Sequence, residues 1–170
     1  MKFLILVLCA AVVAADPHWK MLDHDEVEVV KKTWNEVKNK ETEILAAIFK
    51  EHPDIQNKFP MFAGKSLDQL KSSQPFSLHA TRIVSFITQY ISLLGHDETQ
   101  PAVKTILNEM GQNHRNRGVT KQQLEEFGSS LMKFMKEHSS WNDKAEHAWH
   151  DAMDKMYFVI FSSLDGHPVQ

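Results

Sequence analysis

The chain has 170 residues, with 6 Gly, 6 Pro and one Cys, and a formal charge of −3 at neutral pH. A chain of this length forms one domain with a substantial core, and its mild acidity excludes the basic footprint of nucleic-acid or anionic-membrane binding. Glycine and proline together fall well below the roughly 12% of average proteins. So few helix breakers favour an all-α fold.

The first fifteen residues have the pattern of a targeting segment. After a single lysine, residues 2–15 are nearly all apolar, and small residues stand at Val13 and Ala15. This pattern is typical of a secretory signal peptide, and the run is too short for a membrane span. We therefore expect a signal at residues 1–15, a mature domain at 16–170, and secretion into extracellular fluid.

The single cysteine, Cys9, lies inside the predicted signal, so the mature domain has none. That excludes disulfide scaffolds, cysteine-based zinc sites, iron–sulfur clusters and thiol nucleophiles. A secreted domain without disulfides needs another source of stability.

The first half of the chain divides into short helices. Apolar residues recur at helical spacing as far as Pro53, where a helix must stop because the residue before proline disfavours helical backbone. The pairs Asp23 with Glu26 and Ser66 with Gln69 resemble capping boxes. The expected elements in order are a helix over 27–37, a helix over 44–49, a helical turn at 53–58, an aromatic loop at 59–64 and a short helix opened by Ser66.

The second half contains longer helices. Proline is favoured in the first turn of a helix and glycine just beyond its end. The expected helices run from Pro75 to Gly95, from Pro101 to Gly118, onward from a capping box at Thr120 and Gln123, and from about Asn142 to Leu164. No stretch has the period-two alternation of a strand. We therefore predict an all-α domain of seven or eight helices.

Histidine is the unusual residue, with ten copies that all follow residue 15. Most lie among polar neighbours and are expected to be solvated. His147 and His150 lie three apart on the last predicted helix, so a two-ligand metal site is conceivable there. Their charged neighbours favour a solvated face instead. His52, before Pro53, has no role that the sequence assigns.

Two histidines lie on apolar stripes. His79 follows Phe76 by three residues and precedes Ile83 by four, and His114 follows Met110 by four. Each of two consecutive long helices therefore points one imidazole inward. Taken singly, each would be interpreted as a core histidine bonded to a backbone carbonyl, since a buried imidazole needs a partner.

Taken together, the two inward histidines favour haem. A structural zinc site needs four ligands, and a di-iron bundle needs Glu-x-x-His pairs, which this sequence lacks. Haem brings four equatorial ligands of its own and needs one or two axial groups in an apolar slot. A helical carrier of apolar small molecules stays open as an alternative, and it would show no visible absorption.

At this point the chain resembles the globin family over nearly all of residues 20–165. The most specific stretch is FKEHPDIQNKFPMF at 49–62, where Phe59, six residues after Pro53, matches the phenylalanine that globins stack on haem, and Phe62 matches the second loop aromatic. His79 and His114 fall at the distal and proximal histidines. The signal, HATRIVSF, HRNRGV and the ending FSSLDG resemble the extracellular haemoglobins of midge larvae in particular.

The resemblance implies a pocket for haem b (iron protoporphyrin). His114 would bind the iron through Nε2, its other nitrogen held by a carbonyl of its own helix. His79 would donate a hydrogen bond to bound dioxygen. Arg82, at the haem edge, would pair with a propionate or swing inward as a second donor, unless it is a solvated charge. The remaining implied pocket residues are apolar: Leu45, Phe59, Phe62, Ile83, Met110, Val119, Leu124 and Phe127.

The implied function is reversible dioxygen transport or storage rather than catalysis, by a monomer or homodimer with no nucleic-acid or membrane partner. A nitric-oxide dioxygenase or weak peroxidase would share the pocket and would be distinguished by turnover with a reductant. The lack of an inward carboxylate weakens the peroxidase alternative. Protonation of His79 near physiological pH predicts a pH-dependent oxygen affinity.

Overall fold

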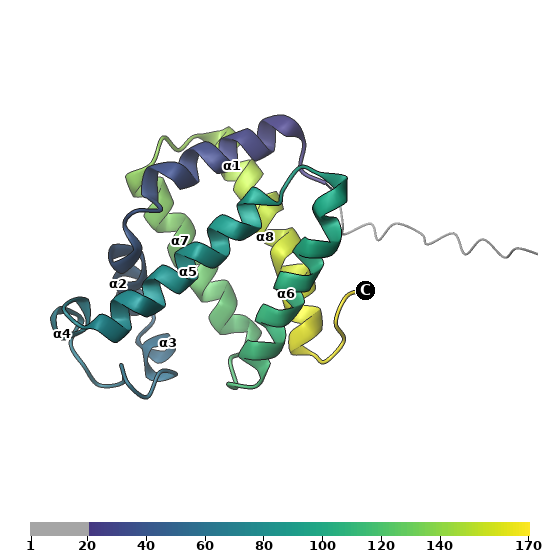
Figure 1. The fold of residues 1–170 in the computed structure, drawn as a ribbon. Helices are drawn as coiled ribbons and strands as arrows, with labels where there is room; N and C mark the ends of the chain where they lie inside the picture. Colours follow the sequence, from purple (N-terminus) through teal and green to yellow (C-terminus); the bar gives the residue numbers. More distant parts are fainter. Residues whose placement is uncertain (1–20) are drawn as a thin grey trace, which may run out of the picture.

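The computed structural model describes residues 21–170, and the predicted signal peptide lies outside them. The described residues form eight α-helices and one 3₁₀ turn, with no strand (Figure 1). The elements are α1 (His24–Val37), α2 (Glu41–Glu51), α3 (Pro53–Asn57), α4 (Leu67–Lys71), α5 (Gln74–Ser92), η1 (Asp97–Thr99), α6 (Gln100–Arg115), α7 (Lys121–His138) and α8 (Asp143–Leu164). The predicted all-α class and helix number are confirmed.

All three predicted capping boxes are present. In α1, α4 and α7 the side chain of the residue just before the helix accepts a hydrogen bond from the backbone N–H three residues later. The side chain of that later residue accepts a hydrogen bond from the backbone N–H of the first. The helices containing Pro75 and Pro101 begin one residue earlier than predicted, so each proline takes the second position. The missing N–H of proline costs no helical hydrogen bond at this position, because the first four N–H groups of a helix have no intrahelical acceptor. Gly95 and Gly118 follow these two helices with φ of 85° and 66°.

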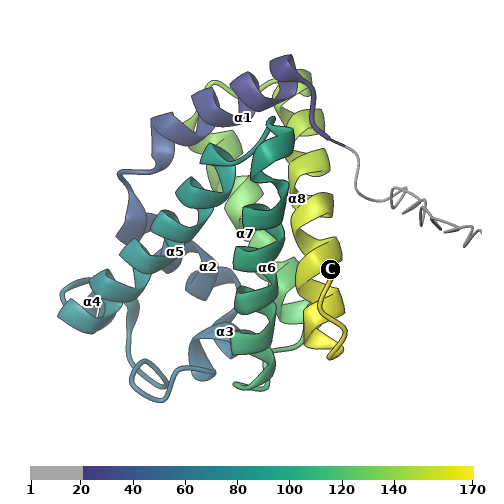
Figure 2. The ribbon, with the colours of Figure 1, turned by 45° about the vertical axis from the view of Figure 1, so that its right-hand side comes forward.

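Helices α5 and α6 lie apart from one another because they pack against different neighbours. In Figures 1 and 2 these two helices diverge from their connection, with α7 visible behind the interval between them. α5 packs against α1 and α2, whereas α6 packs chiefly against α8. The lower ends of α5 and α6 therefore stand apart. None of the described helices is long and apolar enough to cross a membrane.

Buried hydrogen bonds join the helices that support this arrangement. Trp149 on α8 donates from Nε1 to Thr33 Oγ1 on α1 at 2.8 Å, and the Tyr90 hydroxyl on α5 donates to the Ala152 carbonyl on α8 at 2.7 Å. A buried polar group left unpaired costs about 1–3 kcal/mol. These bonds therefore select one packing of α1, α5 and α8.

Gly111 lets α6 lie close against α8. It is buried, and a Cβ at this position would stand 2.6 Å from Ser163 Cβ and 2.7 Å from the Ile160 carbonyl oxygen. A methyl group there would push α6 away from α8. We expect Gly111→Ala to lower the free energy of unfolding by about 1–3 kcal/mol, the range for overpacked cores. Denaturant unfolding measures this, and the exposed Gln112→Ala on the same helix should change it by less than about 0.5 kcal/mol.

Candidate functional site

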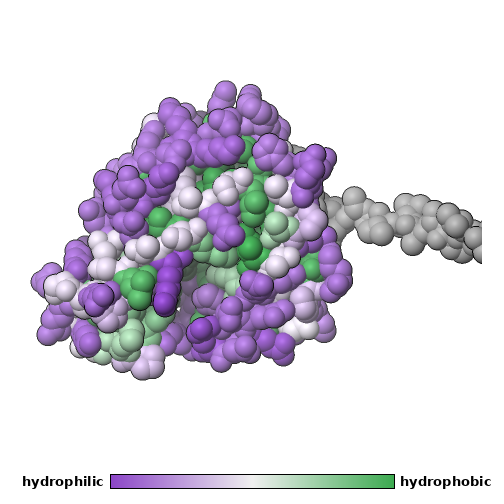
Figure 3. All heavy atoms as spheres, viewed as in Figure 1, coloured by the Kyte–Doolittle hydropathy of each residue, from purple (hydrophilic) through white to green (hydrophobic). Residues whose placement is uncertain are grey.

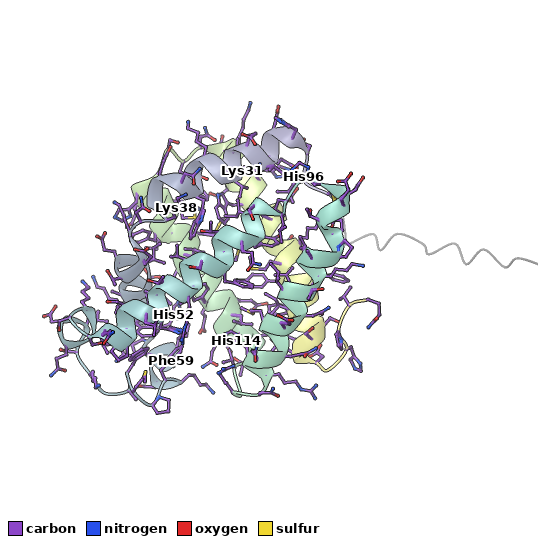
Figure 4. The ribbon with its side chains drawn as sticks, in the orientation of Figure 1. Lys31, Lys38, His52, Phe59, His96 and His114 are labelled. Carbon is purple, nitrogen blue, oxygen red and sulfur yellow. The ribbon has the colours of Figure 1, made fainter. Side chains whose placement is uncertain are left out.

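The two predicted inward histidines face the interval between α5 and α6. His79 lies in the second turn of α5, His114 lies in the last turn of α6, and both are half-buried. In Figure 4, His114 lies on the lower part of α6, on the side towards α5, and Phe59 lies near the lower end of α5. The rings are close enough for His114 to lower the pKa of His79. Two elements thus bring two imidazoles to one site.

The tautomer of His114 is fixed by its own helix. Its Nδ1 lies 2.8 Å from the Met110 carbonyl oxygen, which can only accept, so Nδ1 carries the proton. Burial lowers the pKa of His114, with the bond to Met110 partly opposing that effect. The ring is therefore neutral at neutral pH, and its Nε2 offers a lone pair, which is what a metal-ligating histidine needs.

His79 is also neutral, and more strongly so. Burial is the largest cause that lowers the pKa of His79 to about 4, followed by the charge of Arg82, by His114 when it is protonated, and by the charge of Arg117. The sequence predicted a His79 that is neutral near pH 7 and becomes protonated at somewhat lower pH; burial moves its pKa further down, because the covered ring is penalised for carrying charge. From pH 6 to pH 9 His79 therefore holds a single ring proton that it can donate.

Aromatic side chains hold His79 in place. The Phe59 ring lies edge-on to the imidazole at 4.6 Å between centroids, and the Phe62 ring lies at 6.2 Å. Phe62 is buried, and Gln56 Nε2 donates to its carbonyl oxygen at 2.8 Å, which fixes the loop that carries both rings. Lys58 Nζ donates to the Gly118 carbonyl oxygen at 2.9 Å and ties this region to the turn after α6.

The predicted apolar lining divides into two groups by burial. Leu45, Phe62 and Leu124 are buried in the core. The second group is packed against that core yet half-buried: Phe59, Ile83, Met110, Val119 and Phe127. On this face, Figure 3 shows green and pale side chains recessed among hydrophilic ones.

The chemistry of this lining suits an apolar ligand. The half-buried side chains come from the loop after α3, from α5, from α6 and the turn after it, and from α7. Their remaining exposed surface is apolar, and an apolar ligand that covered it would be favoured by about 25 cal/mol per Å². With one unprotonated imidazole nitrogen on α6 and a neutral imidazole on α5, the donor set fits haem. Arg82 is exposed on α5, next to Ile83.

Comparison with known proteins agrees with the geometry. The sequence profile of the globin family matches residues 42–160. Globin CTT-X and globin CTT-VI, both from Chironomus thummi thummi, are each 45% identical; the alignments cover 88% and 97% of this chain and 99% of each relative. The crystal structure of haemoglobin component TA-VII from Tokunagayusurika akamusi superposes with a TM-score of 0.84 at 43% identity, covering 87% of this chain and 99% of that one.

The described part of the chain is all-α and carries two half-buried, neutral imidazoles on α5 and α6, among half-buried apolar side chains. The chain belongs to the globin family. That family implies a haem cofactor and consists of oxygen-binding carriers rather than enzymes.

Proposed function

We propose that this globin binds haem b between α5 and α6 and carries or stores dioxygen reversibly. One observation carries the proposal: the bond from His114 Nδ1 to the Met110 carbonyl leaves Nε2 unprotonated beside the interval. A proximal histidine needs that tautomer, and the bond also fixes the ring orientation. When bound, haem supplies the ferrous iron at which dioxygen binds.

The other residues of the chain would prepare the pocket for this ligand. Neutral His79 donates a hydrogen bond to dioxygen, which is stronger in a dry pocket than in water. Leu45, Phe59 and Ile83 exclude water on this distal side. Arg82 reaches a haem propionate or serves as a second donor.

The remaining apolar residues enclose the haem from its other sides. Met110 and Val119 flank the proximal side. Leu124 and Phe127 on α7 close the back of the pocket, and Phe62 supports Phe59 from the core, at 5.4 Å between ring centroids.

Secretion is part of the proposal and rests on the sequence. A cleaved signal at residues 1–15 would leave the globin domain at 16–170 in extracellular fluid, as a monomer or homodimer. The names of these relatives, globin and haemoglobin, agree with dioxygen as the ligand.

The absorption spectrum of the purified mature protein tests this function. We expect an intense Soret band that shifts reversibly when oxygen is removed from the ferrous protein and readmitted. A folded protein that stays colourless after incubation with haem would contradict the proposal. Binding of an apolar fluorescent probe by such a colourless protein would instead support the small-molecule carrier.

A further inference from the structure

A second group of ligand-type side chains lies apart from the proposed haem lining. His52 and Asp54 flank Pro53 at the corner between α2 and α3, and Glu126 lies opposite them on α7. One ligand atom from each of these three residues lies within 4.8 Å of the other two. His52 Nδ1 is 3.7 Å from Glu126 Oε2, and the two side chains are only 27% and 24% exposed.

Both carboxylates of this group are oriented by glutamine amides from α7. Gln123 Nε2 donates to Asp54 Oδ2 at 3.1 Å, and Gln122 Nε2 donates to Glu126 Oε1 at 2.8 Å. Each amide engages one oxygen of a carboxylate and leaves the other for a further ligand. Hydrogen bonds to ligating carboxylates are the usual supporting contacts of metal sites.

We propose that His52, Asp54 and Glu126 bind one divalent transition-metal ion, for which Zn²⁺ is the probe. One imidazole nitrogen and two carboxylate oxygens are ligands that Zn²⁺ accepts at about 2.0–2.2 Å, with water in the fourth position. Calcium and magnesium prefer oxygen ligands alone, so the imidazole selects against them. The inference goes beyond oxygen binding, and the ion would join the α2–α3 corner to α7.

The distances are compatible with such an ion. Tetrahedral ligand atoms at these bond lengths lie about 3.4 Å apart. The ligand atoms of the three residues lie at most 4.8 Å apart, so no pair has to approach by more than about 1.4 Å. Side-chain rotation of the exposed Asp54 can supply this movement. The neighbouring Glu51 is not available as a ligand, because its carboxylate is already engaged by Ser130 and Lys133.

A comparable group at α1 and α8 provides the internal control. Ligand atoms of Glu26, His147 and Asp151 also lie within 4.8 Å of one another. The His147 side chain is 72% exposed, however, against 27% for His52, so its position is less restricted. We therefore assign the stronger binding to His52 and not to His147.

Calorimetric titration of the carbon-monoxide-saturated holoprotein with Zn²⁺ tests the assignment. We expect the wild type to bind one strong equivalent, which His147→Gln retains. Losing a residue that only supports a metal ligand already lowers metal affinity by at least about 10-fold. His52→Gln removes a ligand and should therefore weaken Zn²⁺ binding by more than about 10-fold. No strong equivalent in the wild type, or loss in His147→Gln with retention in His52→Gln, would overturn the proposal. Helical circular dichroism and an unchanged Soret band confirm that each variant is folded.

A second variant and a spectroscopic signature keep the test independent of the histidine substitution. Glu126→Gln preserves side-chain size while removing the charge, and it should weaken Zn²⁺ binding as His52→Gln does. X-ray absorption at the zinc edge of the wild type should show nitrogen and oxygen ligands only, at about 2.0–2.2 Å, including an imidazole. A spectrum without imidazole, or unaltered binding by Glu126→Gln, would show that these residues do not form the site.

Discussion

Replacing His114 by glycine is expected to remove most of the affinity for haem. Apolar side chains surround the proposed haem position, and His114 supplies the nitrogen that is both unprotonated and fixed in direction by the bond to Met110. Losing only a residue that supports a metal ligand lowers metal affinity by up to about 100-fold. Because this substitution removes the ligand itself, we expect haem to dissociate more than about 100-fold faster. Transfer of haem to an acceptor apoprotein, followed in the Soret band, measures the rate.

Two controls separate ligand loss from unfolding. Free imidazole should enter the space left in His114→Gly and restore part of the Soret band. His138→Gly is a matched control, since His138 Nδ1 contacts the Phe134 carbonyl oxygen four residues earlier at 2.8 Å, at an exposed position on α7. It should leave haem retention unchanged. A His114→Gly protein that keeps the wild-type haem affinity and spectrum would refute the assignment of the proximal ligand.

The local features of the fold could be predicted from sequence because their signals are local. A capping box links residues three apart, so the pairs at Asp23, Ser66 and Thr120 are visible without tertiary information. The 3₁₀ turn η1 was not predicted. It is a single turn between Gly95 and α6, too short for periodicity to reveal.

The geometry of the site was only partly accessible from sequence. Inward positions for His79 and His114 follow from apolar stripes, and a carbonyl partner within the same helix was expected for His114. The low pKa of His79 was not predictable, because it depends first on how deeply the surrounding elements bury the ring, and then on the charge of Arg82 and on groups of α6 and the turn after it. The cluster of His52, Asp54 and Glu126 depends on α7 packing beside the α2–α3 corner, so no local pattern reveals it.

Replacing His79 by leucine is expected to accelerate oxygen dissociation by about 10- to 100-fold. The bond from a neutral imidazole to a partly charged acceptor contributes about 1.5–3 kcal/mol, and each 1.4 kcal/mol changes an equilibrium or a dissociation rate tenfold. Leucine keeps the site apolar and contacts Phe59 as the ring does, so the lost donor dominates the effect. Stopped-flow displacement of oxygen measures the rate, and His79→Gln, which keeps an N–H donor, should fall between the two.

The pH dependence provides the sharper test of the same residue. With the pKa of His79 near 4, the ring stays neutral from pH 6 to pH 9, so the ratio of leucine-variant to wild-type dissociation rates should be constant over that range. The sign follows from the lowered pKa: protonation becomes significant only as the pH falls towards 4, and the buried charge then favours movement of the ring to solvent. Below about pH 5 the wild type should therefore approach the leucine variant. A ratio that changes between pH 7 and pH 8 would show that another titrating group controls His79.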